Sequence, residues 1–232
     1  MLGLRTPLAL LALIGALTLV LLTGCGSSND GGSTQSSTTA SADDTACQTV
    51  DAPAAKGAQH LKKPQGLLDP SKTWDVRFTT NCGSFTVRLD TTRAPKTAAS
   101  FASLAKKGFY DDLTFHRVAP NFVIQGGDPS GTGSGGPGYT IVEKPPSDLK
   151  YWHGIVAMAK SGTEPDGASG SQFFVVVAQD AQLPPQYALV GRIVQGLEAV
   201  DTIGVQPLQD PTSTDGPPAR PIVIESATVS SH

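Results

Sequence analysis

Apolar and polar residues alternate in two short stretches in the middle of the chain, which predicts two strands. Trp74, Val76 and Phe78 are separated by single polar residues, and the same period returns in residues 85–89. A period of two places successive side chains on opposite faces, so one face of each stretch is expected to be buried. Residues 81–83 (Asn-Cys-Gly) between them carry a turn signal. Together these features predict a β-hairpin.

The pattern becomes helical directly after this hairpin. Pro95 suits the first position of a helix. Ala98, Phe101 and Ala105 then share one side of that helix. Gly108 follows two lysines and is expected to end it.

The rest of the chain predicts further strands and one more helix. Leu197, Val200 and Ile203 are spaced by three, which predicts a short helix. Further strands are expected at residues 114–118, 122–126, 155–159, 172–177, 189–194 and 221–229. Because strands and helices do not alternate regularly, these elements predict a mainly β fold, a closed antiparallel barrel with two α-helices.

A strongly apolar run stands at the N-terminus. Arg5 precedes residues 8–22, which are almost all apolar, and Cys25 follows small residues. This arrangement is typical of a signal peptide and is short for a membrane-spanning helix. It resembles a bacterial lipoprotein signal, which implies that Cys25 becomes the lipidated first residue. The acyl chains would anchor the protein to the extracytoplasmic face of the cell membrane. The alternative is an uncleaved anchor with an incidental cysteine.

Changes in composition divide the chain into segments. Residues 1–24 are assigned to the signal peptide. Residues 25–45 are rich in Ser, Thr and Gly without apolar periodicity, so they predict a flexible tether. Residues 46–71 contain prolines and are expected to be extended and partly docked onto the folded domain, residues 72–232.

Two further cysteines, Cys47 and Cys82, fall in the pre-domain segment and in the hairpin turn. An exported protein meets an oxidising compartment, so a disulfide between them is one prediction and two unpaired thiols are the alternative. Their spacing does not decide between the two, because geometry sets whether a disulfide closes.

Composition and motifs argue against several kinds of function. The 17 basic and 20 acidic residues give a net charge of −3, and no basic stripe indicates nucleic-acid binding. The four histidines lack the spacing of metal ligands. Residues 131–136 satisfy G-x-G-x-x-G, but Pro137 follows where a phosphate-binding helix would have to begin. We therefore expect no metal and no other cofactor.

Two later strands combine apolar and amide side chains. Alternation places Val123 and Gln125 on one face of a strand. It also places Gln172 and Phe174 on one face of another. A dry core rarely accepts an unpaired amide, whereas a half-apolar groove with a few polar groups is the usual form of a ligand site. The alternative is a pair of core strands whose glutamines bond to the backbone.

Three segments resemble the signature of the cyclophilins. They are FHRVAPNFVIQGGD at residues 115–128, GIVAMA at 154–159 and GSQFF at 170–174. The resemblance covers roughly residues 72–229 and implies an eight-stranded antiparallel β-barrel capped by two α-helices. It also implies peptidyl-prolyl cis–trans isomerase activity. Arg117 matches the family arginine that stabilises the twisted X–Pro bond, without a covalent intermediate.

Other site residues are implied by the same resemblance, position by position. Those implied to line the proline pocket are Phe122, Val123, Phe174 and Leu183. Those implied to contact the rest of the substrate or to border the site are Gln125, Gly131, Ala159, Lys160, Gln172 and Tyr187. Gln125 and Gln172 would orient the substrate backbone and the arginine. Ala159 and Lys160 would act through backbone groups on the residue before proline.

Two departures from the family pattern affect these expectations. Gln182 stands where the best-known members carry a tryptophan that helps to bind cyclosporin, which implies weak cyclosporin binding with activity retained. The loop at residues 160–170 is longer than in common eukaryotic members. We expect a monomer that acts on Pro-containing segments of exported proteins. The alternative is a membrane-tethered chaperone or binding module that grips such segments without turnover, and Arg117 favours the enzyme.

Overall fold

Two long strands form the predicted hairpin. The computed structural model describes residues 47–232. Strands β1 (Trp74–Thr80) and β2 (Gly83–Leu89) pair antiparallel, with Phe78 opposite Phe85. Both of these rings face the interior, so the alternation of apolar residues correctly identifies the buried face.

The predictions for the N-terminal part of the chain lie outside the described residues. They concern the signal peptide at residues 1–24, lipidation of Cys25 and the tether at residues 25–45. Within the described range, 47–232, no helix has both the length and the apolar character needed to cross a membrane.

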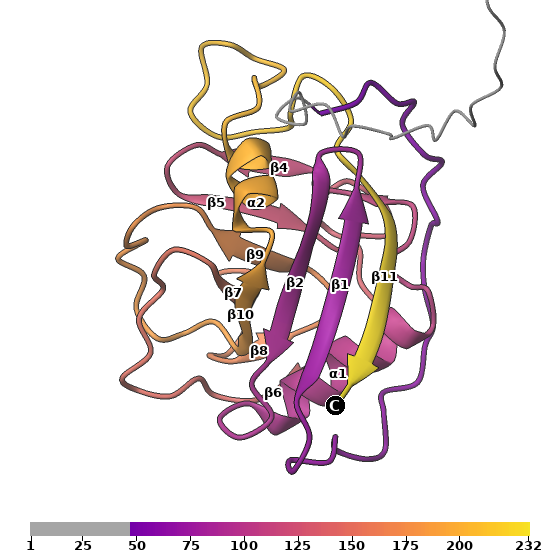
Figure 1. Ribbon diagram of the computed structural model, residues 1–232, viewed down its shortest axis with the longest axis vertical. Coiled ribbons are helices and arrows are strands. Elements are labelled where there is room, and N and C mark those ends of the chain that lie inside the picture. The colour runs from indigo at the N-terminus through magenta and orange to yellow at the C-terminus, as the bar shows by residue number, and fades with distance from the viewer. Residues whose placement is uncertain (1–46) are drawn as a thin grey trace, which may run out of the picture. The chain divides into compact units, whose positions relative to one another are not determined.

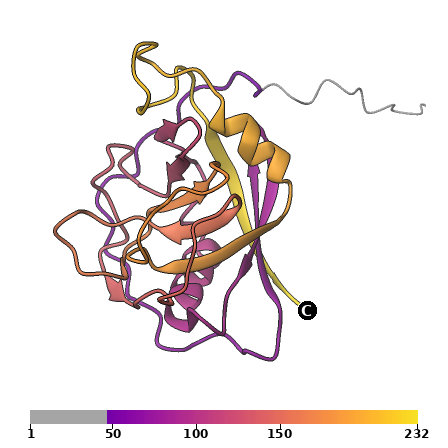
Figure 2. The same ribbon diagram turned by 90° about the vertical axis from the view of Figure 1, so that its left-hand side faces the viewer.

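Nine strands of the described part form a single antiparallel sheet. Besides β1 and β2 they are β3 (Leu113–Thr114), β4 (Arg117–Ala119), β5 (Val123–Gly126), β7 (Ile155–Met158), β9 (Phe173–Val176), β10 (Leu189–Gln195) and β11 (Val223–Ser231). Their order is β3-β11-β1-β2-β10-β7-β9-β5-β4. Only Phe115 and His116 separate the edge strands β3 and β4 in the chain, so the sheet curls round on itself (Figures 1 and 2). The fold is the expected mainly β one, but nine strands form a curled half-barrel sheet instead of eight forming a closed barrel.

Short strands account for the differences from the predicted elements. The strand predicted at residues 114–118 is divided, because Phe115 still donates its N–H to Ile222 beside β11, whereas Arg117 pairs with β5. A second, two-stranded sheet joins β6 (Ile141–Val142) to β8 (Ala168–Ser169). Strands of two residues are too short to show a period, so the sequence does not predict them.

The two helices lie where the sequence predicts them. They are α1 (Pro95–Lys106) and α2 (Leu197–Gly204). The residue before α1, Ala94, offers no side-chain cap. Instead, the carboxylate of Glu143 accepts hydrogen bonds from two backbone N–H groups of the first turn, at 3.0 and 2.7 Å. A negative group at this position satisfies unpaired donors and complements the helix dipole.

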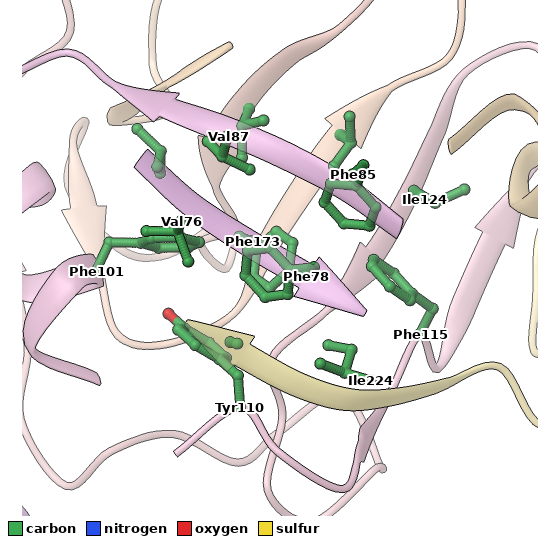
Figure 3. Packing of buried hydrophobic residues seen from close by; sticks show 14 of the residues in the cluster. Val76, Phe78, Phe85, Val87, Phe101, Tyr110, Phe115, Ile124, Phe173 and Ile224 are labelled. Carbon is green, nitrogen blue, oxygen red and sulfur yellow. The ribbon is translucent and has the colours of Figure 1, made fainter. Parts of the chain in front are cut away.

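The main core is built around Phe78, in the middle of β1. Figure 3 shows its ring among those of Phe85, Phe101, Tyr110 and Phe173. The ring centres lie 5.1 to 6.0 Å from that of Phe78, and none of the five residues is more than 1 % exposed. Full burial of one such side chain stabilises the fold by about 1.5–3 kcal/mol. This cluster therefore contributes a large part of the apolar stabilisation.

Strands β4, β5, β7 and β9 are apolar on both faces. Side chains on one face belong to the main core: Val118, Ile124, Val156, Met158, Phe173 and Val175. Side chains between them form a second cluster on the outer face: Ala119, Val123, Ala157, Phe174 and Val176. Loops rather than helices cover this second cluster, so part of its surface stays accessible.

Residues 47–72 contain no helix or strand, and we call this segment the strap. A disulfide joins Cys47, at its start, to Cys82 in the β1–β2 turn. Further along the strap, Leu61 and Leu68 pack against the main core. In Figure 1 the indigo strap passes from the β1–β2 turn along one side of the sheet to the start of β1.

Candidate active site

Arg117, at the start of β4, is held from two sides. Its Nη1 donates to Oε1 of Gln125, its cross-strand partner on β5, at 2.9 Å. Its Nε and Nη2 donate to the two carboxylate oxygens of Asp215 at 2.7 and 2.6 Å. A bidentate pair of this kind fixes the plane of the guanidinium. Since a guanidinium has five N–H donors and three are used here, two remain for a ligand.

A backbone bridge places Asp215 beside Arg117. The N–H of Val118 donates to the carbonyl of Gly216 at 2.8 Å, and the N–H of Gly216 donates back at 3.1 Å. Because this bridge is antiparallel, Arg117 and Asp215 lie on the same face at its two ends, and the long arginine side chain spans the diagonal between them. The sequence does not reveal Asp215, because residues 205–220 show no periodicity and no motif.

Gln125 and Gln172 extend the hydrogen bonds away from the guanidinium. Nε2 of Gln125 donates to Oε1 of Gln172 at 3.0 Å. Nε2 of Gln172 then donates to the carbonyl oxygens of Gly133 and Gly135, at 2.9 Å each. We call residues 129–138 the glycine-rich loop. The sequence leaves open whether the glutamines bond to the backbone or face a ligand groove. Gln172 does both, because it bonds to backbone carbonyls and also lines a groove.

Asp128 holds the start of the glycine-rich loop. Its carboxylate accepts hydrogen bonds from the N–H and the hydroxyl of Ser130 at 2.7 Å and from the N–H of Gly133 at 2.5 Å. Burial alone would raise its pKa, but hydrogen bonds from Ser130, Gly135 and Gly133 outweigh burial and lower the pKa below the ordinary value of 3.8. Gly131 is exposed on the same loop and lies outside the groove lining, although the family resemblance implies that it borders the site.

The apolar side chains expected to form the proline pocket adjoin this polar row on the outer face of the sheet. The residues expected to line or close the proline pocket all belong to the second cluster: Phe122, Val123, Phe174, Leu183 and Tyr187. Val123 and Phe174 are only 2 % and 4 % exposed and form its floor, whereas the other three are half-buried at its rim. Gln125 is the cross-strand partner of Phe174, so the polar row and the apolar pocket are contiguous.

Tyr151 supports the rim of the pocket. Its hydroxyl donates to the carbonyl of Tyr187 at 2.7 Å and accepts a hydrogen bond from the N–H of Tyr187 at 3.0 Å. The Tyr187 ring stands edge-on to Phe174, with ring centres 5.4 Å apart. Burial raises the pKa of Tyr151 to about 12, so its hydroxyl stays protonated at neutral pH and keeps donating.

Ala159 and Lys160 leave the end of β7 along the groove. The N–H of Ala159 donates to the carbonyl of Gln172 at 2.9 Å, so the carbonyl of Ala159 is the backbone group left for a ligand. The ammonium of Lys160 donates to two carbonyl oxygens of its own loop at 3.3 and 3.2 Å and lies 5.7 Å from the centre of the Tyr187 ring. Two of its three N–H donors are therefore used within the protein.

The groove beside the polar row has a volume of about 1040 Å³. Gln125, Gln172, Ala159 and Lys160 line it together with the glycine-rich loop. Residues of the strap line it as well, which the sequence does not predict, because docking of an irregular segment leaves no periodic signal. The structure thus brings together all the predicted site residues of the described range except Gly131, and it adds Asp215.

Comparison with known proteins bears directly on this arrangement. The sequence profile described as "Cyclophilin type peptidyl-prolyl cis-trans isomerase/CLD" matches residues 75–229. The chain belongs to this cyclophilin family. It is a peptidyl-prolyl cis–trans isomerase of the cyclophilin type.

Similar proteins cover the isomerase domain of this cyclophilin. Peptidyl-prolyl cis-trans isomerase-like 1 of Emericella nidulans is 42% identical over 135 residues, which are 56% of this chain and 82% of the relative. The protein of the same name in Mus musculus is 41% identical over 143 residues, covering 59% and 84%. A crystal structure of a cyclophilin type isomerase from Cryptosporidium parvum has a TM-score of 0.62 and 32% identity, covering 69% of this chain and 99% of that one. The strap precedes the residues that match the family profile.

Other titratable groups of this cyclophilin take no direct part in the polar row. Both ring nitrogens of His116 lack a hydrogen-bond partner within residues 47–232. Burial lowers the pKa of His116, so the ring is neutral at neutral pH and adds no second positive charge beside Arg117. The same range contains no group of three or more His, Cys, Asp or Glu side chains placed to hold a metal ion.

Proposed function

We propose that this isomerase accelerates X–Pro rotation by presenting Arg117 to the prolyl nitrogen as the amide twists. Rotation has a barrier of about 18–20 kcal/mol because amide resonance is lost. In the twisted state the nitrogen becomes pyramidal and carries a lone pair that accepts a hydrogen bond. A fixed guanidinium stabilises this state more than the planar substrate, which lowers the barrier by differential binding. No covalent bond to the enzyme forms at any step.

The contiguity of the polar row and the apolar pocket carries this proposal. Two of the five N–H donors of Arg117 are free, while the other three hold the guanidinium in place. A proline ring seated over Val123 and Phe174 would lie beside the guanidinium, because Gln125 pairs with both Arg117 and Phe174 across neighbouring strands. Gln125 and Gln172 then orient the substrate backbone.

Asp215 is assigned the role of a positioning residue. It contacts no part of the pocket and acts through Arg117, whose plane it fixes by two hydrogen bonds. The ion pair is partly exposed, with side chains 32% and 45% accessible, so its contribution to folding stability is small. Its contribution to catalysis is larger, because a freely rotating guanidinium would spend less time in the productive orientation.

We infer that the enzyme works on exported polypeptides from a lipid anchor at the extracytoplasmic face of the cell membrane. The apolar run at residues 8–22 followed by Cys25 supports this inference. The disulfide between Cys47 and Cys82 agrees with it, because such bonds persist mainly in oxidising compartments. Mass measurement of the mature N-terminus tests the anchor: an acylated Cys25 supports it, and an unprocessed Met1 contradicts it.

Turnover of a peptide enriched in the cis X–Pro form tests the mechanism. The full chain accelerates isomerisation, and Arg117→Ala lowers kcat/KM by about 10²–10³-fold, the usual loss when one fixed donor to a transition state is removed. Arg77→Ala, which removes an exposed arginine on β1, serves as the matched control and leaves the rate unchanged. If neither the wild type nor Arg117→Ala accelerates isomerisation, but both still bind the peptide, the protein is instead a binding module.

A further inference from the structure

The strap is attached to both ends of the glycine-rich loop. The N–H of Lys56 donates to the carbonyl of Pro129 at 2.8 Å, and the N–H of Leu61 donates to the carbonyl of Pro137 at 2.8 Å. Residues 57–60 therefore bridge the two ends of the glycine-rich loop, which Gln172 contacts in its middle. The ammonium of Lys56 also donates to two carbonyl oxygens just after α1, at 3.3 and 3.2 Å, which fixes the strap from its other side.

The strap and the loop approach each other too closely for a side chain to fit between them. Gly138 has a φ of +89°. A Cβ atom added there would lie 2.4 Å from the carbonyl oxygen of Gln59 and 2.8 Å from Cα of His60. Backbone atoms cannot move far enough to relieve contacts at such distances. Position 138 therefore has to be glycine while the strap is docked. This fit indicates a docked position for residues 57–60.

The strap forms one wall of the groove that Gln125 and Gln172 line. Ala58 and Gln59 line the same groove as Gln125, Gln172 and Ala159. The strap lies outside the family match at residues 75–229, so this wall is an addition to the isomerase domain. The groove also includes Ala159, whose backbone is expected to meet the residue before proline, so its strap side is within reach of residues further from the proline.

The chemistry of this wall favours substrates that donate hydrogen bonds. Nε2 of Gln59 donates to the carbonyl of Lys56 at 3.1 Å, which leaves its Oε1 as an acceptor. On the facing side of the groove, the carboxylate of Glu164 uses one oxygen to accept from the N–H of Ser161 and keeps the other. The ammonium of Lys160 already uses two of its three donors within its own loop, so Oε1 of Gln59 and the second carboxylate oxygen of Glu164 are the acceptors that this part of the groove offers.

We propose that Ala58 and Gln59 of the strap determine substrate specificity, by selecting a hydrogen-bond donor side chain two residues before the proline. Lysine and glutamine fit this requirement, whereas leucine and glutamate do not. The proposal rests on the isomerase function assigned above and adds to it the class of sequence that this enzyme prefers.

Peptide selectivity of the full chain tests the proposal. The substrates are a set of peptides that differ only at the position two before proline, with glutamine, lysine, leucine or glutamate. The wild type should turn over the glutamine and lysine peptides about three- to tenfold faster in kcat/KM than the other two, the range expected for one hydrogen bond. Gln59→Leu should abolish this preference. A dipeptide substrate is too short to reach the strap, so the wild type and Gln59→Leu should turn it over at the same rate.

Matched variants separate this proposal from its alternatives. Gln65→Leu changes a glutamine of the strap that lies outside the groove and should keep the selectivity of the wild type. Ala58→Leu narrows the groove without removing a hydrogen bond and should lower kcat/KM for the long peptides only. Unchanged selectivity in Gln59→Leu overturns the strap proposal while turnover itself persists. Absence of turnover in the wild type would instead overturn the proposed mechanism, on which the strap proposal depends.

Discussion

Both faces of β4, β5, β7 and β9 carry large apolar side chains, yet one is a core and the other, which also holds Arg117 and Gln125, is the candidate binding site. Phe173 points to the inner face and is 0% exposed, enclosed by α1 and the hairpin. Phe174 points to the outer face, where loops cover the cluster incompletely and leave Phe122 and Leu183 half-buried. The apolar side chains alone therefore do not distinguish a core from a binding site here. The covering elements do, because helices close a surface that loops leave open.

Alanine at two adjacent positions gives the largest expected effects and tests this difference directly. Phe173→Ala should lower the free energy of unfolding by about 3–5 kcal/mol, since it opens a cavity in a closed core. Phe174→Ala should cost less stability, because its site already borders solvent, but should raise KM for a proline peptide. Urea unfolding and steady-state kinetics measure the two effects. Equal stability losses with an unchanged KM would contradict the distinction between the faces.

Removal of the disulfide should affect stability and leave the pocket intact. Cys82 belongs to the main core, and Cys47 packs against it, away from the outer cluster. Replacing both cysteines by serine should lower the free energy of unfolding by about 2–4 kcal/mol, because the unfolded chain gains freedom. The kcat/KM for a dipeptide substrate should not change at temperatures where the variant is folded. A fall in that rate at constant folded fraction would show that the two faces are coupled.

Asp215→Asn should affect catalysis and leave stability almost unchanged. The amide keeps the size of the carboxylate but donates at one atom, so it cannot hold Arg117 by two accepted hydrogen bonds. We expect kcat to fall about tenfold, as for the loss of one charge-assisted hydrogen bond, with KM nearly constant. Asp215→Glu should restore part of the rate. Asp210→Asn, in the same loop, is the control, and an equal loss there would assign the effect to loop structure.

The smallest effect concerns Asp128 and acid. Because hydrogen bonds lower its pKa in the folded state, its carboxylate stabilises the fold above the ordinary value of 3.8. That contribution is lost as the pH falls below about 4, where the folded state must also take up the proton. The stability difference between wild type and Asp128→Asn should therefore shrink from pH 6 to pH 3. A stability difference that stays constant from pH 6 to pH 3 would show that the ionised carboxylate of Asp128 does not stabilise the fold.

The fold and most of the site follow from local patterns in the sequence. Alternation in residues 74–89 identifies the hairpin and its buried face. Alternation also places Gln125 and Phe174 on faces that the structure makes contiguous, and the motif around Arg117 supplies the rest of the polar row. These predictions succeed because neighbours in sequence along a strand have fixed relative directions.

The parts that sequence does not predict depend on contacts between distant segments. Asp215 meets Arg117 across 98 positions of the chain, through a bridge between an irregular loop and β4. The strap reaches the groove through two backbone hydrogen bonds, donated by the N–H groups of Lys56 and Leu61, which any residue type except proline could make. The division of residues 114–118 into β3 and β4 likewise depends on which strands lie on either side.

The curl of the sheet has a consequence for an isomerase whose substrates are Pro-containing polypeptides. Its two edge strands, β3 and β4, have two and three residues, and Gly216 already pairs with the middle of β4. A long free edge would invite an extended client to add itself as another strand and remain bound. The edge strands β3 and β4 leave few backbone N–H and C=O groups unpaired. The enzyme can therefore bind exposed polypeptide repeatedly without promoting its aggregation.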